Sequence, residues 1–325
     1  MNRRDAIKFM TAALAGSTLP LNASFAVELA GGIVKLVVGV PPGGPTDMLA
    51  RLVAPRLADA LNLNVIVENR PGGGQTIAAN LVAGSPTDGR NLFFCTQTLA
   101  ANPFIYKGLS YDPVNAFRGV SLLATLPYGL FASNNVPADD LPSLISFLSK
   151  NPGKYNFASS GASSLPRLAG EIFKSKLGLN ILHIPYAGSG PALISLASNE
   201  TQIFFSDFLM VDPLIKSGRI KAIATAYDRR LEVAKDVPTF SEQGVEELSL
   251  AAWFGIVAPQ KTPDTIIQKL NELLNEITNE KAIYDDIVSK GGVPRGDLTV
   301  EQFDAFIKDE MEVYKDIIGK INLEV

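Results

Sequence analysis

Two glycine-rich segments are the parts of this sequence whose residue types best suit the binding of a ligand. Residues 40–47 read VPPGGPTD and residues 68–76 read ENRPGGGQT, and each lies between a strand-like run and a helix-like one. Such turns expose backbone N–H groups at the positive end of a helix dipole, which attracts an anion. We expect Thr46 or Asp47 to cap the helix that follows the first turn. Each segment alone would be an ordinary strand-to-helix turn. Two of them at successive strand ends of one sheet edge favour an anion site.

Hydroxyl and carboxyl side chains follow two strand-like runs in the second half of the sequence. Residues 159–164 read SSGASS and precede a helix-like run, and Asp207 follows the apolar run 202–205. The hydroxyls either hold a second carboxylate or only cap the helix. Asp207 either orients a hydrogen-bond donor of the ligand or caps the next segment.

The residue types exclude several kinds of chemistry. One Cys and one His among 325 residues are too few for a disulfide framework, a zinc site or an iron–sulfur cluster. We expect Cys95 to be a buried core thiol, and His183 in the run ILHIP to pack in a strand. No phosphate-binding loop, dinucleotide-binding glycine pattern or G-x-S-x-G elbow occurs. We therefore expect no catalytic residues, no metal and no cofactor, with a hydrolase that uses Ser160 or Ser163 as the enzyme alternative.

Residues 1–26 have the pattern of a secretory signal peptide. Basic residues precede a short apolar stretch, and residues 24–26 (SFA) place small residues at the −3 and −1 positions of a cleavage site. Arg3-Arg4 partly matches a twin-arginine signal, which leaves Sec and twin-arginine export open. Cleavage after Ala26 removes three basic residues and one acidic residue, so the net charge changes from −4 to −6. We expect a periplasmic protein that does not bind nucleic acid, because no cluster of Lys and Arg stands out.

Strand-like and helix-like runs alternate along the chain, which predicts an α/β fold with parallel strands. The predicted strands lie at 33–40, 65–67, 92–96, 128–133, 155–158, 181–184, 202–206, 220–226 and 250–257. The predicted helices lie at 47–61, 76–83, 142–150, 165–177, 191–198 and 209–217, with two more beginning near Thr262 and Thr299.

The length of the chain indicates two lobes, because about 300 residues usually exceed a single hydrophobic core. The runs near 125–133 and 250–257 are candidates for strands that cross between the lobes. This predicts lobe 1 at residues 27–127 plus 252–325 and lobe 2 at residues 128–251.

The two glycine-rich turns, together with Arg51, resemble the Bug family of periplasmic solute-binding proteins of tripartite tricarboxylate transporters. Further matching motifs occur in order at 86–89, 109–113, 184–188, 215–219, 237–240 and 253–255. The resemblance implies a two-lobed periplasmic-binding-protein fold of the type II kind. Each lobe would be a mostly parallel sheet flanked by helices, and a carboxylate would bind in the cleft between the lobes. Membrane permease subunits would be the partners of a monomeric protein, and docking on a signalling receptor is the alternative.

The resemblance also implies which residues contact the ligand. In lobe 1 these are Pro42, Gly43, Gly44, Thr46 and Asp47 in the first turn and Gly73, Gly74, Gln75 and Thr76 in the second; in lobe 2 they are Ser160, Gly161, Ser163, Ser164 and Asp207. Gln75 stands where the family usually has Gly, Thr76 where it has Asn, and Arg167 where it has His. These three differences from the family pattern bear on which ligand is bound and not on the fold.

Overall fold

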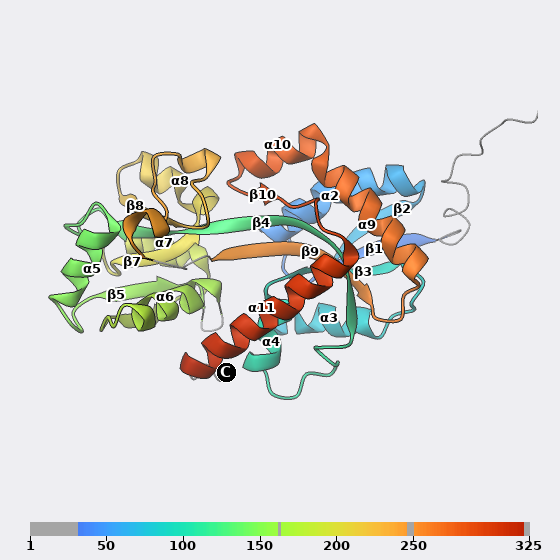
Figure 1. Cartoon of the computed structure of the whole chain (residues 1–325), viewed down its shortest axis with the longest axis horizontal. Coiled ribbons are helices and arrows are strands. Elements are labelled where there is room, and N and C mark those ends of the chain that lie inside the picture. The colour runs from blue at the N-terminus through green and yellow to red at the C-terminus, as the bar shows by residue number, and fades with distance from the viewer. Residues whose placement is uncertain (1–31, 162–163, 246–249, 322–325) are drawn as a thin grey trace, which may run out of the picture.

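A continuous β-sheet runs along the molecule in the computed structural model, which describes residues 32–161, 164–245 and 250–321 (Figure 1). The signal peptide expected at 1–26 and the candidate residue Ser163 lie outside the described residues. The strands are β1 (Ile33–Val38), β2 (Asn64–Asn69), β3 (Asn91–Thr96), β4 (Phe117–Ser133), β5 (Asn156–Ser159), β6 (Leu182–Pro185), β7 (Ile203–Asp207), β8 (Ile220–Ala226), β9 (Ala251–Pro259) and β10 (Val293–Pro294).

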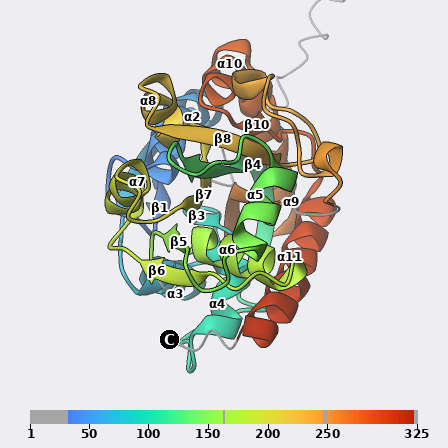
Figure 2. The same cartoon turned by 90° about the vertical axis from the view of Figure 1, so that its left-hand side faces the viewer.

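Helices cover both faces of this sheet. They are α2 (Pro45–Leu61), α3 (Thr76–Ala83), α4 (Thr98–Ile105), α5 (Leu141–Ser149), α6 (Leu165–Lys176), α7 (Ser189–Ala197), α8 (Phe208–Lys216), α9 (Asp264–Asn279), α10 (Lys281–Ser289) and α11 (Val300–Ile321). In two views at right angles, α2, α8 and α10 lie on one side of the long strands and α3, α4, α6 and α11 on the other (Figures 1 and 2). Within the described ranges, no helix is both long and apolar enough to cross a bilayer.

Strand β4 links two halves of the sheet. From Phe117 to Pro127 it pairs antiparallel with β9, and from Tyr128 to Ser133 it pairs antiparallel with β7 and β8. Parallel pairing lies farther out, among β1, β2 and β3 in the first half and among β5, β6 and β7 in the second. The sheet is therefore mixed. The strand predicted at 128–133 is only the end of β4, because its beginning pairs with the first half.

Alternating side chains of β1 enter two hydrophobic cores. Val34 and Leu36 belong to the core that contains residues of α2 and α9, whereas Val37 belongs to the core that contains residues of α3, α4 and α11. A strand buried on both faces reads as an uninterrupted apolar run, as this one does. Cys95 is fully buried, with its Sγ 3.4 Å from the Gly255 carbonyl oxygen, and burial raises the pKa of this thiol. The prediction of a core thiol is confirmed.

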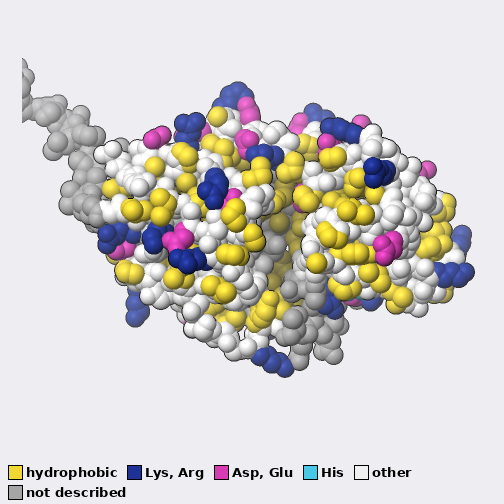
Figure 3. Space-filling model, turned by 180° about the vertical axis from the view of Figure 1, so that it is seen from behind, with side chains coloured by type: hydrophobic (Ala, Val, Ile, Leu, Met, Phe, Trp, Pro, Cys, Tyr) yellow, Lys and Arg dark blue, Asp and Glu magenta, His cyan; other side chains and the backbone are white. Residues whose placement is uncertain are grey.

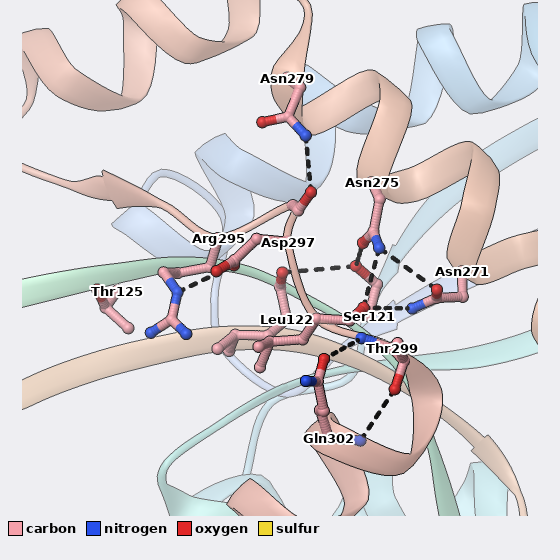
Figure 4. A network of polar contacts seen from close by, with 12 residues as sticks. Ser121, Leu122, Thr125, Asn271, Asn275, Asn279, Arg295, Asp297, Thr299 and Gln302 are labelled. Carbon is pink, nitrogen blue, oxygen red and sulfur yellow. Dashed lines mark hydrogen bonds and ion pairs between the residues drawn. The ribbon is translucent and has the colours of Figure 1, made fainter.

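Three asparagines on α9 fix the segment that precedes α11 (Figure 4). Asn271 Nδ2 donates to the carbonyl oxygens of Val120 (2.7 Å) and Leu298 (3.1 Å). Asn275 Nδ2 donates to the same Leu298 oxygen at 2.9 Å, and Asn279 Nδ2 donates to a carbonyl of the same segment at 2.6 Å. Residues four apart share a helix face, so the three amides form one row. The row ties α9 to β4 and sets the start of α11, which continues into contact with α6 of the second half.

Candidate functional site

A cavity of about 170 Å³ lies between the two halves of the molecule. Its polar lining comes from Gln97, Thr98 and Asn102 of the first half, from Ser160 and Ser164 of the second half, and from Tyr128 of β4 and Tyr314 of α11. Seen from behind, the molecular surface is hollowed between the halves (Figure 3). Two of the predicted site residues, Ser160 and Ser164, thus meet side chains of the opposite half.

Two helices begin at this cavity, one from each half. Helix α4 starts at Thr98 and α6 starts at Leu165, directly after its N-cap residue Ser164. The first-turn N–H groups of a helix have no partners within the helix and carry partial positive charge. The Ser164 hydroxyl donates to the Gly161 carbonyl oxygen at 2.8 Å, which closes the loop in front of α6. The cavity therefore combines positive helix ends with hydroxyl groups, a combination that suits an anion.

A charged network holds the turn at residues 40–47. Asp47 Oδ2 accepts from the Gly43 N–H (3.0 Å) and from Arg51 Nε (3.0 Å), while its Oδ1 accepts from Asn69 Nδ2 (2.8 Å). The Arg51 guanidinium, helped by Asn69 and the Gly43 N–H, lowers the pKa of Asp47 to about 2. Asn69 Nδ2 also donates to the Val40 carbonyl oxygen at 3.0 Å. Because Asn69 ends β2, the network joins the first turn to the second strand.

The first turn differs in detail from the sequence prediction. Thr46 or Asp47 was the expected cap of α2, but Gly44 occupies the N-cap position and Pro45 is the first helical residue. Thr46 and Asp47 are buried in the first turn of the helix, and the Asp47 carboxylate reaches back to the Gly43 N–H. That prediction was wrong because Pro45, with its fixed φ and missing N–H, begins the helix before either residue.

The second turn contains four successive residues with positive φ. Gly72, Gly73, Gly74 and Gln75 have φ values of 131°, 56°, 60° and 78°. The Gly74 carbonyl oxygen accepts from the Asn102 side chain at 2.8 Å, which docks the turn on α4. Gln75 is buried, and its Nε2 donates to Thr96 Oγ1 at 2.8 Å. The turn therefore contacts the end of β3, the strand that leads into the cavity.

The remaining predicted residues are distributed over both halves of the molecule. Pro42 and Gly43 are exposed, Thr76 is the first residue of α3, and Gly161 has a φ of 139°. Asp207 is the N-cap of α8: its Oδ1 accepts from the Met210 N–H at 2.9 Å, and burial raises its pKa. Of its two possible roles, the structure shows the cap.

A second, smaller cavity brings the starts of α2 and α8 together. It measures about 50 Å³ and is lined by Pro45 and Met48 of the first half and by Leu209 of the second. Leu209 is two residues beyond the buried cap Asp207, and Pro45 is the first residue of α2. The halves therefore face each other through helix starts at both cavities.

Sequence reasoning missed the contribution of the third parallel strand. Gln97 and Thr98 follow β3 directly and line the larger cavity, yet neither was predicted. The rule that ligands bind beyond the carboxyl ends of parallel strands would have found them. The first two turns were predicted from their glycines, and the residues that directly follow β3 contain none. Tyr128 was missed because nothing local distinguishes it from other strand residues.

His183, which is half-buried, and the buried Ser159 form a hydrogen-bonded pair. Ser159 Oγ lies 2.6 Å from His183 Nε2 and 3.0 Å from the Gly161 carbonyl oxygen. Since a carbonyl only accepts, the serine proton goes to Gly161 and the imidazole Nε2–H donates to the serine. Ser159 is fully buried, and burial, together with the positive charge of Arg167, lowers the pKa of His183 to about 4. The imidazole packs against the Phe157 ring at 5.0 Å, in keeping with a packing role.

Two α/β halves joined by a long strand, with helix starts facing a cavity between them, form the two-lobed fold of periplasmic solute-binding proteins. Residues 49–323 match the family described as the tripartite tricarboxylate transporter family receptor. The chain belongs to this family, and the resemblance to Bug proteins is confirmed.

Relatives cover nearly the whole chain. Protein BugT of Bordetella pertussis is 31% identical over 287 residues, which cover 88% of each chain. The structure of Rpa4515 from R. palustris with adipate is 30% identical, with a TM-score of 0.77 over 88% of this chain and 96% of that one. The structure of MatC from Rhodopseudomonas palustris with bound malate is 28% identical, with a TM-score of 0.74 over 88% and 98% of the two chains.

Proposed function

We propose that the protein binds a small organic acid between its two halves and delivers it to the membrane subunits of a tripartite tricarboxylate transporter. The observation that carries this proposal is the cavity at which Thr98, Ser160 and Ser164 meet at the starts of α4 and α6. The family assignment and the relatives with adipate and malate support a carboxylate as the ligand.

Backbone and hydroxyl donors are sufficient in magnitude to bind such a ligand. A hydrogen bond to a charged group contributes about 1.5–3 kcal/mol net. A micromolar dissociation constant corresponds to about 8 kcal/mol, so three or four such bonds are enough. Because each half supplies only some of the donors, the ligand favours the arrangement in which both halves contact it.

We keep the residues implied by the family resemblance as proposed ligand contacts, and the cavity adds two positions. The set is Pro42, Gly43, Gly44, Thr46, Asp47, Gly73, Gly74, Gln75, Thr76, Ser160, Gly161, Ser163, Ser164 and Asp207, with Gln97 and Thr98 added. No metal, cofactor or catalytic residue enters the proposal.

We also propose the division of the chain and its location. Lobe 1 comprises residues 27–127 and 252–325, and lobe 2 comprises residues 128–251. The exchange of β4 partners between Pro127 and Tyr128 supports this boundary. In this proposal the protein is exported to the periplasm and cleaved after Ala26. The intact mass of the protein purified from a periplasmic extract tests the cleavage site.

A thermal-shift screen of the mature chain, residues 27–325, tests the proposed function. The panel contains adipate, malate, other carboxylic acids and the neutral diamide of adipic acid. A ligand at 100 times its dissociation constant adds about 2.7 kcal/mol to the free energy of unfolding, a shift of several degrees. A shift with acids that remain unconsumed supports a binding protein. Consumption of an acid would indicate an enzyme, and the absence of any shift would refute carboxylate binding.

A further inference from the structure

Gln75 adopts a conformation that a glycine would adopt more easily. Its φ of 78° lies in the left-handed region, which disfavours residues that carry a Cβ. Its side chain is only 7% exposed and fits tightly over Gly39, where an added Cβ would lie 2.5 Å from the Gln75 Cβ. Backbone strain of this kind persists where the surroundings hold the residue in place. The contact that distinguishes glutamine from glycine here is the hydrogen bond from its amide.

That amide fixes the direction of the hydrogen bonds that lead to the cavity. Thr96 Oγ1 accepts from Gln75 Nε2 at 2.8 Å and from the Thr98 N–H at 3.4 Å, so both of its lone pairs are occupied. Thr96 Oγ1 lies 3.0 Å from Thr98 Oγ1. By distance alone either hydroxyl can donate in this contact. Because both lone pairs of Thr96 are taken, we assign the donated proton to Thr96 and the accepting role to Thr98. The Thr98 hydroxyl proton is then directed elsewhere, and Thr98 lines the cavity between the halves.

We propose that Gln75 is a positioning residue for ligand specificity, which makes the Thr98 hydroxyl a donor toward an oxygen atom of the ligand. This inference rests on the proposed binding of an organic acid and deepens it. Gln75 does not line this cavity, so the inference replaces the direct contact that the family resemblance implies for it with an action through Thr96. Thr96 is 3% exposed and lies between Gln75 and Thr98. A carboxylate oxygen, which only accepts, is the group that this arrangement recognises.

A glutamate in place of Gln75 reverses the direction of the same bonds. Burial raises the pKa of a carboxyl group at this position. Above that pKa the carboxylate accepts only, so Thr96 would donate to it and Thr98 would donate to Thr96. Thr98 would then present lone pairs to the cavity, which suit an N–H group of a ligand. The Gln75→Glu variant should therefore lower the preference for adipate over its neutral diamide.

Isothermal titration calorimetry with adipate and malate tests the proposal on the mature protein. The variants are Gln75→Leu, Thr98→Val, the double variant and Thr98→Ser. We expect each of the first two to weaken binding about tenfold, the size of one lost hydrogen bond. The double variant should bind no more weakly than the weaker single variant, because both changes remove the same donor. Thr98→Ser, which keeps the hydroxyl, should bind more tightly than Thr98→Val.

Melting temperatures of the ligand-free variants separate this role from a purely structural one. Gln243→Leu is a matched control, because Gln243 Nε2 donates to the Ile223 carbonyl oxygen in the second half and does not line the cavity. It should lower the melting temperature and leave the affinity unchanged. If Gln75→Leu unfolds, Gln75→Met keeps most of the side-chain stem.

Three results would overturn the inference: wild-type affinity in Gln75→Leu, additive losses in the double variant, or an unchanged preference in Gln75→Glu. If the wild type binds none of the acids, the proposed function fails together with the inference. If the wild type binds and the variants do not differ from it, the inference alone fails.

Discussion

Gly44 offers a sharp test of whether the start of α2 contacts the ligand. It is the N-cap residue, with φ −85° and ψ 171°, an extended conformation open to every residue type. A Cβ added there would have no atom within 4 Å. Gly43 is a poorer probe, because its φ of 97° would strain any larger residue and its N–H donates to Asp47. We therefore choose the substitution Gly44→Leu.

The expected loss of ligand affinity follows from the contacts that a leucine at position 44 would prevent. If the ligand carboxylate approaches the N–H groups at the start of α2, the new side chain displaces it from one or two charge-assisted bonds. Each contributes about 1.5–3 kcal/mol, so the dissociation constant should rise about 10- to 150-fold per bond lost. The melting temperature of the ligand-free protein should change little, because the backbone conformation is allowed and the added atoms meet open space.

Titration calorimetry with the best acid from the screen measures this loss, alongside thermal unfolding without ligand. Gly319→Leu is the control: it also adds a leucine at a glycine with no atom within 4 Å of the new Cβ, but on α11, where Gly319 is exposed. It should bind like the wild type. Wild-type affinity in Gly44→Leu, with the fold intact, would refute the reasoning that the start of α2 forms part of the site.

Three further predictions concern stability. The pKa of Asp47 is lowered to about 2, so the ionised carboxylate stabilises the fold fully above about pH 4 and loses this effect as the pH falls toward 2. In Asp47→Asn, the free energy of unfolding measured with urea should depend less on pH across that range, and an unchanged dependence would contradict this. The pKa of His183 is lowered to about 4, so the unfolded chain takes up a proton at a higher pH than the folded one, and the free energy of unfolding falls as the pH drops from about 6.5 toward 4. His183→Gln should remove this decrease in the same urea measurement, and a decrease that persists would belong to other groups. Asn271→Leu leaves the Val120 carbonyl oxygen without the amide donor and should lower the free energy of unfolding by about 1–3 kcal/mol, with wild-type stability as the contrary result.

The sequence predicted much of the architecture because its signals are local. The strand at 92–96 coincides closely with β3, and the helix at 76–83 has the bounds of α3. Ser160 and Ser164 of the hydroxyl loop line the cavity, and their contact with a ligand stays a prediction. In each case, a short apolar run or a turn composition decides the local structure without help from distant residues.

What the sequence did not predict depends on distant contacts. Helix α4 is eight residues long and contains Pro103, so it offers little helical periodicity to detect. The bond between Asp47 and Asn69 joins residues that are 22 positions apart, and it decides which N–H groups of the first turn are already occupied. The full length of β4 was missed because Pro127 interrupts its apolar run, although the strand continues on both sides of it.

A carboxylate at the start of α2 needs an explanation in a protein for which we propose an anionic ligand. The Asp47 side chain accepts from the Gly43 N–H, from Asn69 and from Arg51, so three donors compensate its charge. An ion pair of this kind contributes little net charge to its surroundings, while its bonds fix the turn and the end of β2 in one arrangement. In the proposed mode of binding, the anion meets donors that are held in place before it arrives, which lowers the entropic cost of binding. As inferred above, specificity rests on Gln75 and Thr98, and replacing them should change the hydrogen bonds offered to the ligand without changing the fold.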